Sequence, residues 1–208
     1  MLEEDLAHFA IQQSSKMGFD YSEARVQRDT FISVSLNSGI PDVPLKGEFY
    51  GIGIRAIYKG AMGFSSTNVL TKESVLEVLG NLKRTLESIT ATRENEKVKL
   101  SDEDALTANW SVDERTKFED VSLDWFLKKS KELDDVAKSE EKVKQRLIRL
   151  SGSLQLKYFT NSEGTIVRSR TPRYLLTAFI TAYDSSDIAQ RFIEIGGSGG
   201  PEVLDRLK

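Results

Sequence analysis

The hydrophobic period of this sequence changes repeatedly, and these changes limit the folds that the chain can adopt. The stretch YSEARVQRDTFISVSLN, residues 21–37, places apolar side chains at alternate positions, which is typical of a strand with one buried face. Residues 2–17 before it carry apolar side chains at helical spacing, and Gly18 is placed to end that helix. The chain therefore begins with a helix followed by a half-buried strand.

Residues 37–89 predict a loop, a hairpin and a second helix. NSGIPDVPLKG contains two prolines and two glycines and predicts a loop, and EFYGIGIRAIYKGAMGFSST predicts two antiparallel strands that turn at Tyr58-Lys59-Gly60. Thr71 can cap a helix whose first turn contains Glu73. An apolar stripe makes this helix the clearest in the sequence. Its members are Val75, Leu79, Leu82, Leu86 and Ile89.

A charge-rich stretch, TATRENEKVKLSDED, starts at Thr90, interrupts these patterns and predicts an internal boundary. A third helix is expected from about Ser122 to Lys138. Its expected inward residues are Phe126, Leu127, Leu133, Val136 and Ala137. The period after Val143 suits a helix or a strand, and the alternation of Leu154, Leu156 and Tyr158 favours a strand. Asn161-Ser162-Glu163-Gly164 then predicts a turn, and YLLTAFITAYD predicts a well-buried strand.

These patterns predict an α+β fold of antiparallel sheets with packed helices, arranged as two similar lobes. We expect the first lobe at residues 1–92, the second at 93–195 and a glycine-rich junction at 196–208. The junction contains GGSGG followed by Pro201 and Glu202, which suit the first turn of a helix. We interpret it as a flexible or tightly turned joint that enters a further helix.

Composition excludes several classes of function. The chain of 208 residues has 29 Lys+Arg against 32 Asp+Glu, a net charge of −3, which argues against nucleic acid as a partner. It contains no cysteine, so disulfides, thiol nucleophiles and thiolate metal sites are excluded. MLEEDLAHFA lacks the basic start of a signal peptide, and no apolar run approaches the ~20 residues that span a bilayer. A cytoplasmic protein without membrane contact is therefore expected.

Candidate catalytic and ligand-binding motifs are few. His8 is the only histidine, so a two-histidine zinc site cannot form, and we interpret His8 as a surface or half-buried helix residue. GIGIRA at Gly51 matches the dinucleotide fingerprint, but the strand pattern continues where that fingerprint needs a helix. Gly51 and Gly53 are instead expected to allow a bulge or a close backbone neighbour. GGSGG lacks the Lys-Ser/Thr that follows a phosphate-binding loop.

Two pairs of acidic residues, Asp134-Asp135 and Glu140-Glu141, are adjacent in sequence and therefore point to different faces of a helix. This arrangement argues against a general acid/base pair and predicts a solvated face.

Three arginines surround Pro172 between two predicted strands. Arg168, Arg170 and Arg173 could hold a carboxylate or a phosphate, and we expect an exposed basic loop instead. No catalytic, cofactor-binding or metal-ligating residue is therefore predicted in this chain.

Four motifs, in order, resemble the TldD/PmbA family. They are GFDYSEARVQR, GIGIRAIYKGAMGFSSTNVLTKESV, YFTNSEGT and EIGGSGGPEVL, and the second is the most similar to the family. The closing glycine pairs resemble the TldD branch more than the PmbA (TldE) branch. The similarity runs over essentially the whole chain, although residues 90–140 contribute nothing to it.

The resemblance implies that the parent protein is a zinc-dependent metallopeptidase of unfolded peptides. TldD-like members carry an H-E-x-x-x-H helix shortly after the glycine segment, where two histidines bind zinc and the glutamate activates water. This chain has no His-Glu pair, so no catalytic or metal residue is transferred to it. We expect it to be the N-terminal, non-catalytic portion, serving scaffold, assembly or peptide access, with zinc only in the full-length protein.

The resemblance also implies partners, namely peptide substrates and either a TldE/PmbA-like subunit in a heterodimer or further copies in a homo-oligomer. The alternative is a non-enzymatic peptide- or partner-binding module, in keeping with the family's older label, modulator of DNA gyrase. The strand patterns at residues 25–36 and 154–158 are expected to offer exposed edges that an extended peptide could join by strand addition.

Overall fold

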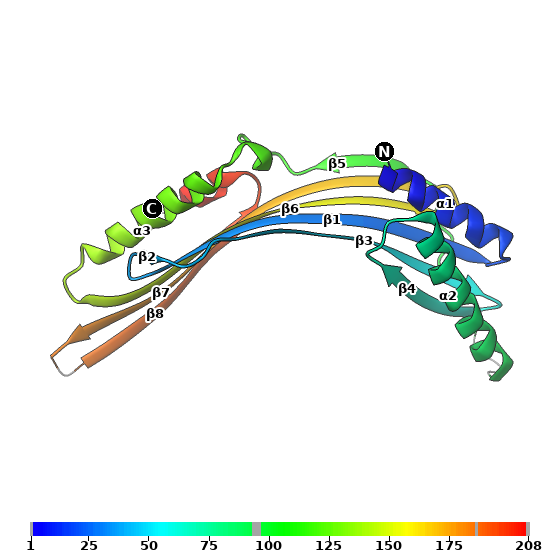
Figure 1. Cartoon of the computed structure of the whole chain (residues 1–208), viewed down its shortest axis with the longest axis horizontal. Helices are drawn as coiled ribbons and strands as arrows, with labels where there is room; N and C mark the ends of the chain where they lie inside the picture. The colour runs from blue at the N-terminus through cyan, green and yellow to red at the C-terminus, as the bar shows by residue number, and fades with distance from the viewer. Residues whose placement is uncertain (1, 93–96, 186, 207–208) are drawn as a thin grey trace. The chain divides into compact units, whose positions relative to one another are not determined.

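The computed structural model describes residues 2–92, 97–185 and 187–206 (Figure 1). These residues form three α-helices and two short 3-10 helices: α1 (Leu2–Lys16), α2 (Lys72–Thr92), η1 (Phe118–Asp120), α3 (Leu123–Lys138) and η2 (Pro201–Arg206). The strands are β1 (Tyr21–Asn37), β2 (Ile40–Pro41), β3 (Leu45–Tyr58), β4 (Ala61–Thr67), β5 (Thr107–Ser111), β6 (Val143–Asn161), β7 (Ile166–Asp184) and β8 (Asp187–Ser198).

The eight strands of the described residues belong to one antiparallel sheet, which confirms the predicted α+β class. Their order is β4-β3-β1-β6-β7-β5, with β2 paired to β1 and β8 paired to β7. The hairpin of β3 and β4 pairs Tyr58 with Ala61, and the backbone of Lys59 and Gly60 adopts φ of 50° and 83°. The predicted turn at these residues is confirmed.

The chain divides into two compact units built from interleaved segments. Unit 1 comprises residues 1–28, 49–110 and 156–169, and unit 2 comprises residues 29–48, 111–155 and 170–208. The strands β1, β3, β6 and β7 each contribute residues to both units. The sequential division into lobes at residues 92 and 93 stays a prediction.

In unit 1, α1 and α2 cover one face of the strands (Figure 1). Gly18, with φ of 77°, follows the end of α1, and the Thr71 hydroxyl oxygen accepts a hydrogen bond from the Ser74 amide at 3.1 Å. The predicted helix stop and helix cap are therefore confirmed. The core joins the α2 stripe to alternate residues of β1 and β3, including Ala24 and Ile54.

Unit 2 has its own core between α3 and the strands. Ser122 caps α3 by accepting a hydrogen bond from the Trp125 amide. The expected inward face of this helix was partly wrong, because Val136 is 71% exposed and the fully buried side chains are Phe126, Ser130 and Asp134. These three are spaced four residues apart and therefore lie on one helical face.

Three loop or strand predictions need correction. The expected loop at residues 37–47 contains β2, and β3 already begins at Leu45. Arg168, Arg170 and Arg173 lie within β7 rather than in a loop. The strand YLLTAFITAYD is only half-buried. Its exposed apolar residues are Leu175, Phe179 and Tyr183.

The described residues contain no helix that combines the length and the apolar character needed to cross a membrane.

Candidate functional site

His8 lies on α1 and is exposed, but its ring reaches the sheet of unit 1. Its Nε2 lies 2.6 Å from the Tyr158 hydroxyl in a hydrogen bond, and the two rings meet edge to face at 5.7 Å. Burial raises the pKa of the Tyr158 hydroxyl above its ordinary value. A hydrogen bond between an imidazole and a phenol fixes the position of a helix but supplies neither a nucleophile nor a zinc site.

Two of the three predicted arginines of β7, Arg168 and Arg170, are engaged by carboxylates, and Arg173 is exposed. Arg168 makes a bidentate pair with Glu4 of α1, at 2.8 and 2.7 Å, and this hydrogen-bonded guanidinium lowers the pKa of Glu4. Arg170 binds both Glu114 and Glu119 at 2.6 to 2.9 Å. These ion pairs link separate segments of the chain, and they leave few free guanidinium N–H donors for a phosphate.

The acidic pairs have separate environments. Asp134 is fully buried and accepts a hydrogen bond from Nε of Arg146 at 2.9 Å, whereas Asp135 is exposed and pairs with Lys131. The solvated face predicted for this run is therefore wrong for Asp134. Glu140 and Glu141 are both exposed. Nothing in this arrangement brings two carboxylates together for acid/base chemistry.

The glycine motifs are parts of strands. Gly51 and Gly53 lie in β3, which continues to Tyr58, so the helix that a dinucleotide fingerprint needs is missing. A Cβ added to Gly51 would lie 3.0 Å from the Thr67 carbonyl oxygen, which confirms the expected close backbone neighbour. At Gly53 the close neighbour is instead the Phe64 ring, 2.9 Å from such a Cβ.

The GGSGG segment, expected to be a flexible or tightly turned joint, is strand in its first part and a turn in its second. Gly196 and Gly197 belong to β8 and pair with Leu175 and Tyr174 of β7. The turn is confined to Gly199 and Gly200, and the helix after it is the 3-10 helix η2. The Glu202 carboxylate accepts a hydrogen bond from the Arg115 amide at 2.8 Å, which docks η2 onto the chain before η1. The last two residues of the predicted junction, 207 and 208, lie outside the described part of the chain.

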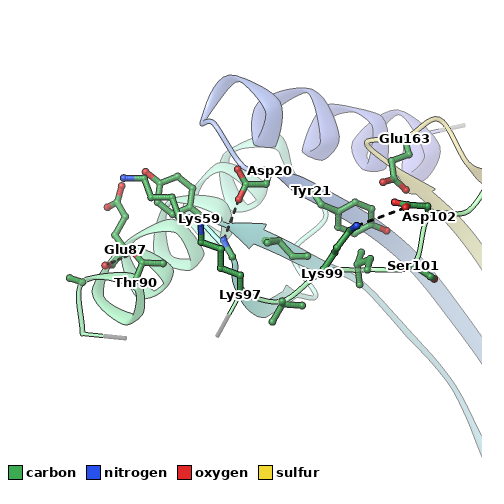
Figure 2. A pocket seen from close by; sticks show the side chains of 16 residues that line it. Asp20, Tyr21, Lys59, Glu87, Thr90, Lys97, Lys99, Ser101, Asp102 and Glu163 are labelled. Carbon is green, nitrogen blue, oxygen red and sulfur yellow. Dashed lines mark hydrogen bonds and ion pairs between the residues drawn. The ribbon is translucent and has the colours of Figure 1, made fainter. Parts of the chain in front are cut away.

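A polar hollow lies in unit 1 where the ends of β1 and β3 meet the last turns of α2 (Figure 2). Its volume is about 1080 Å³. Three lysines line it, Lys59, Lys97 and Lys99, against four carboxylates, Asp20, Glu87, Asp102 and Glu163. Lys99 and Asp102 lie 3.9 Å apart. Since the charges nearly balance, the hollow has no strong preference for an anion or a cation.

On the face of the unit 1 sheet turned away from α1 and α2, the side chains of Phe64 and Arg25 are exposed. Sequence reasoning did not find this surface, because it requires the strand order β4-β3-β1-β6. The sequence indicated this surface only through the polar residues that alternate with apolar ones in residues 21–37. Here Phe64 is 66% exposed, and the Arg25 guanidinium lies 5.9 Å from the centre of the Phe159 ring.

The strand edges predicted to receive a peptide are occupied. Both β1 and β6 lie inside the sheet, β1 between β3 and β6, and β6 between β1 and β7. In the described part of the sheet, the terminal strands of unit 1 are β4, with β3 as its neighbour, and β5, with β7 as its neighbour. The hypothesis of strand addition at residues 25–36 and 154–158 is therefore wrong.

Zinc, which the resemblance implies for a full-length protein, does not fit the residues present. The sequence has a single histidine and no cysteine, and the described residues contain no group of three His, Asp or Glu side chains that could hold a metal ion. His8 is bonded to a phenol and not to a carboxylate that would orient it as a ligand.

Two family models match consecutive parts of the chain. The model described as PmbA/TldA metallopeptidase domain 1 matches residues 22–89, and the PmbA/TldA metallopeptidase central domain matches residues 116–207. A curated relative, the metalloprotease MJ0996 of Methanocaldococcus jannaschii, is 22% identical over 188 residues. That match covers 89% of this chain and 41% of the relative, so the chain spans about two fifths of its length.

Solved structures share the fold. A putative modulator of DNA gyrase from Bacteroides thetaiotaomicron matches with a TM-score of 0.76 and 17% identity, over 94% of this chain and 45% of that one. TldE from Thermococcus kodakarensis matches with a TM-score of 0.76 and 15% identity, over 94% of this chain and 43% of that one. The two successive domain models show that this chain belongs to the PmbA/TldD family.

Proposed function

We propose that this chain is the N-terminal, non-catalytic portion of a TldD-like, zinc-dependent metallopeptidase that cleaves unfolded peptides in the cytoplasm. One observation carries the proposal: two metallopeptidase domain models match in order over residues 22–89 and 116–207, in a sequence with one histidine and no cysteine. A zinc-bound water needs three protein ligands, and the described residues contain no group of three His, Asp or Glu side chains that could hold the metal. The reactive centre would therefore lie in other polypeptide.

The role proposed for these residues is scaffold, assembly or peptide access. The polar hollow and the open sheet face of unit 1 suit binding without chemistry, because neither pairs a nucleophile with a base. Peptides are the proposed substrates of the parent protein. A TldE/PmbA-like subunit, or further copies of the chain, are its proposed assembly partners.

The reading frame after the codon for Lys208 tests this proposal directly. We expect it to continue into a helix in which two histidines flank a glutamate. A stop codon at that point would contradict the proposal and would favour a self-standing module that binds peptides or a partner without cleaving them. A second measurement is hydrolysis of an unfolded protein such as casein: the 208-residue chain should show none, with or without added zinc.

A further inference from the structure

The sheet face of unit 1 opposite α1 and α2, which we call the open face, carries charged and aromatic side chains. It is defined by six residues on four neighbouring strands: Phe64 of β4, Arg55 of β3, Glu23 and Arg25 of β1, and Lys157 and Phe159 of β6. Alternate residues of these strands, such as Ala24, Ile54 and Tyr158, are buried against the helices. The six residues therefore point to the other side, since successive strand residues face opposite ways.

Contacts link these side chains in a row across the strands. Phe64 is the direct cross-strand partner of Arg55, and its ring lies over Gly53, where no side chain competes for the space. The Arg55 guanidinium binds the Glu23 carboxylate at 2.7 Å. This carboxylate raises the pKa of Arg55 and fixes its charge. The row therefore begins with an exposed aromatic ring beside an arginine that is paired with Glu23.

The far end of the row is also cationic and aromatic. Arg25 is exposed and stacks on Phe159, an arrangement that leaves the in-plane N–H groups of the guanidinium available to a carboxylate. Lys157 lies two residues from Phe159 on the same face. The only carboxylate among the six residues is that of Glu23, which is 13% exposed and already bound to Arg55.

The open face thus carries three cations and one carboxylate in a chain whose net charge is −3. We propose that it binds an acidic, extended polypeptide segment, with an apolar side chain against Phe64 and a carboxylate on Arg25 and Lys157. Four strands at a spacing of about 4.8 Å span about 14 Å, which an extended segment of about five residues crosses.

Charge complementarity favours a polypeptide over a nucleic acid. A phosphate backbone needs many cations, whereas the excess on the open face is two, which matches one or two carboxylates of a short peptide. The exposed Phe64 and the stacked Phe159 provide apolar surface for side chains of a peptide. The choice of a polypeptide rests on the proposed function, although the binding test below does not depend on the reading frame or on hydrolysis.

The test is fluorescence anisotropy of the full 208-residue chain with a labelled peptide in which glutamate alternates with valine. We expect saturable binding that weakens about tenfold between low and high salt, because exposed charges are screened. The double variant Arg25→Gln/Lys157→Gln should weaken binding by about tenfold or more, and Phe64→Ser by a smaller factor. Arg191→Gln removes an exposed strand arginine of unit 2 and should leave the affinity unchanged.

Several results would overturn the proposal. Equal affinity for a peptide with lysine in place of glutamate would remove the charge argument, and tighter binding of a single-stranded oligonucleotide would show a different partner. NMR amide shifts confined to β8 or to the hollow of Figure 2, with none at Gly53, Arg25 or Phe159, would place the peptide elsewhere. Circular dichroism checks that the double variant keeps the native fold. If it does, misfolding cannot explain a loss of binding.

Discussion

At the scale of single residues, the buried pair of Asp134 and Arg146 is the feature that local sequence conceals. Asp134 is 0% exposed and Arg146 is 6% exposed. The backbone of Ser38 donates to the Arg146 carbonyl at 2.7 Å, and a Cβ on Gly39 would lie 2.9 Å from Oδ2 of Asp134. The pair therefore joins α3, β6 and the turn after β1 within unit 2.

We expect Asp134→Ala to lower the free energy of unfolding by about 3–5 kcal/mol, because it leaves the Arg146 guanidinium buried without its counter-ion. Urea denaturation measures the change. Asp135→Ala is the matched control: its side chain is 55% exposed, so its loss should cost less than about 1 kcal/mol. If Asp134→Ala unfolded at the same urea concentration as the control, the pair would not hold unit 2 together.

At the scale of elements, the sequence predicts best where one element carries its own pattern. The α2 stripe and the alternation in β1 are local, and both appear as expected. The strand β8 was not predicted. It pairs with β7, and its first six residues are exposed. These six residues therefore show no hydrophobic period. The same cause hid the cationic open face, which residues from four strands form together.

The packing of α2 on β4 makes a glycine necessary. A Cβ on Gly63 would lie 2.8 Å from Leu82 and 3.0 Å from Leu86 of the helix. We expect Gly63→Ala to destabilise the protein by about 1–3 kcal/mol, since the buried Leu82 and Leu86 side chains must move to make room for the new methyl group. Gly80→Ala, within α2 and without any atom within 4 Å of the new Cβ, should instead stabilise it by up to about 1 kcal/mol. Chemical denaturation of both variants checks the opposite signs.

The link between η1 and β7 depends on pH. The hydrogen bond from Arg170 lowers the pKa of Glu119 below its ordinary value of 4.5. The folded protein therefore binds fewer protons than the unfolded chain in this range, so the stabilisation is present above about pH 4.5 and is lost as the pH falls through the folded pKa.

We expect Glu119→Gln to lower the urea midpoint at pH 7 and to make its decline below pH 4.5 shallower than in the unchanged protein. Urea titrations across pH 3 to 7 give both quantities. Glu140→Gln, which removes an exposed carboxylate outside the Arg170 cluster, should keep the full decline. Equal slopes for the unchanged protein and Glu119→Gln would show that the pair makes no contribution.

At the scale of the whole molecule, the family match and the side-chain inventory point in different directions. The chain matches two metallopeptidase domain models, yet it carries a single imidazole, on α1 of unit 1. Sequence alone predicted both the family and the lack of a zinc motif in these 208 residues, because each depends on residue identity rather than on packing. The arrangement of surfaces that could receive a peptide needed the strand order.

Zinc titration of the purified chain tests the side-chain inventory. Carboxylates alone bind Zn²⁺ weakly in water, and tight sites combine several His or Cys ligands with fixed geometry. We therefore expect isothermal titration calorimetry to show no one-to-one complex with micromolar or tighter affinity, and thermal stability to be the same with zinc as with a chelator. His8→Asn should not alter either result. A tight complex that His8→Asn abolishes would mean that α1 contributes a ligand. The proposal that zinc is bound only by polypeptide outside this chain would then be wrong.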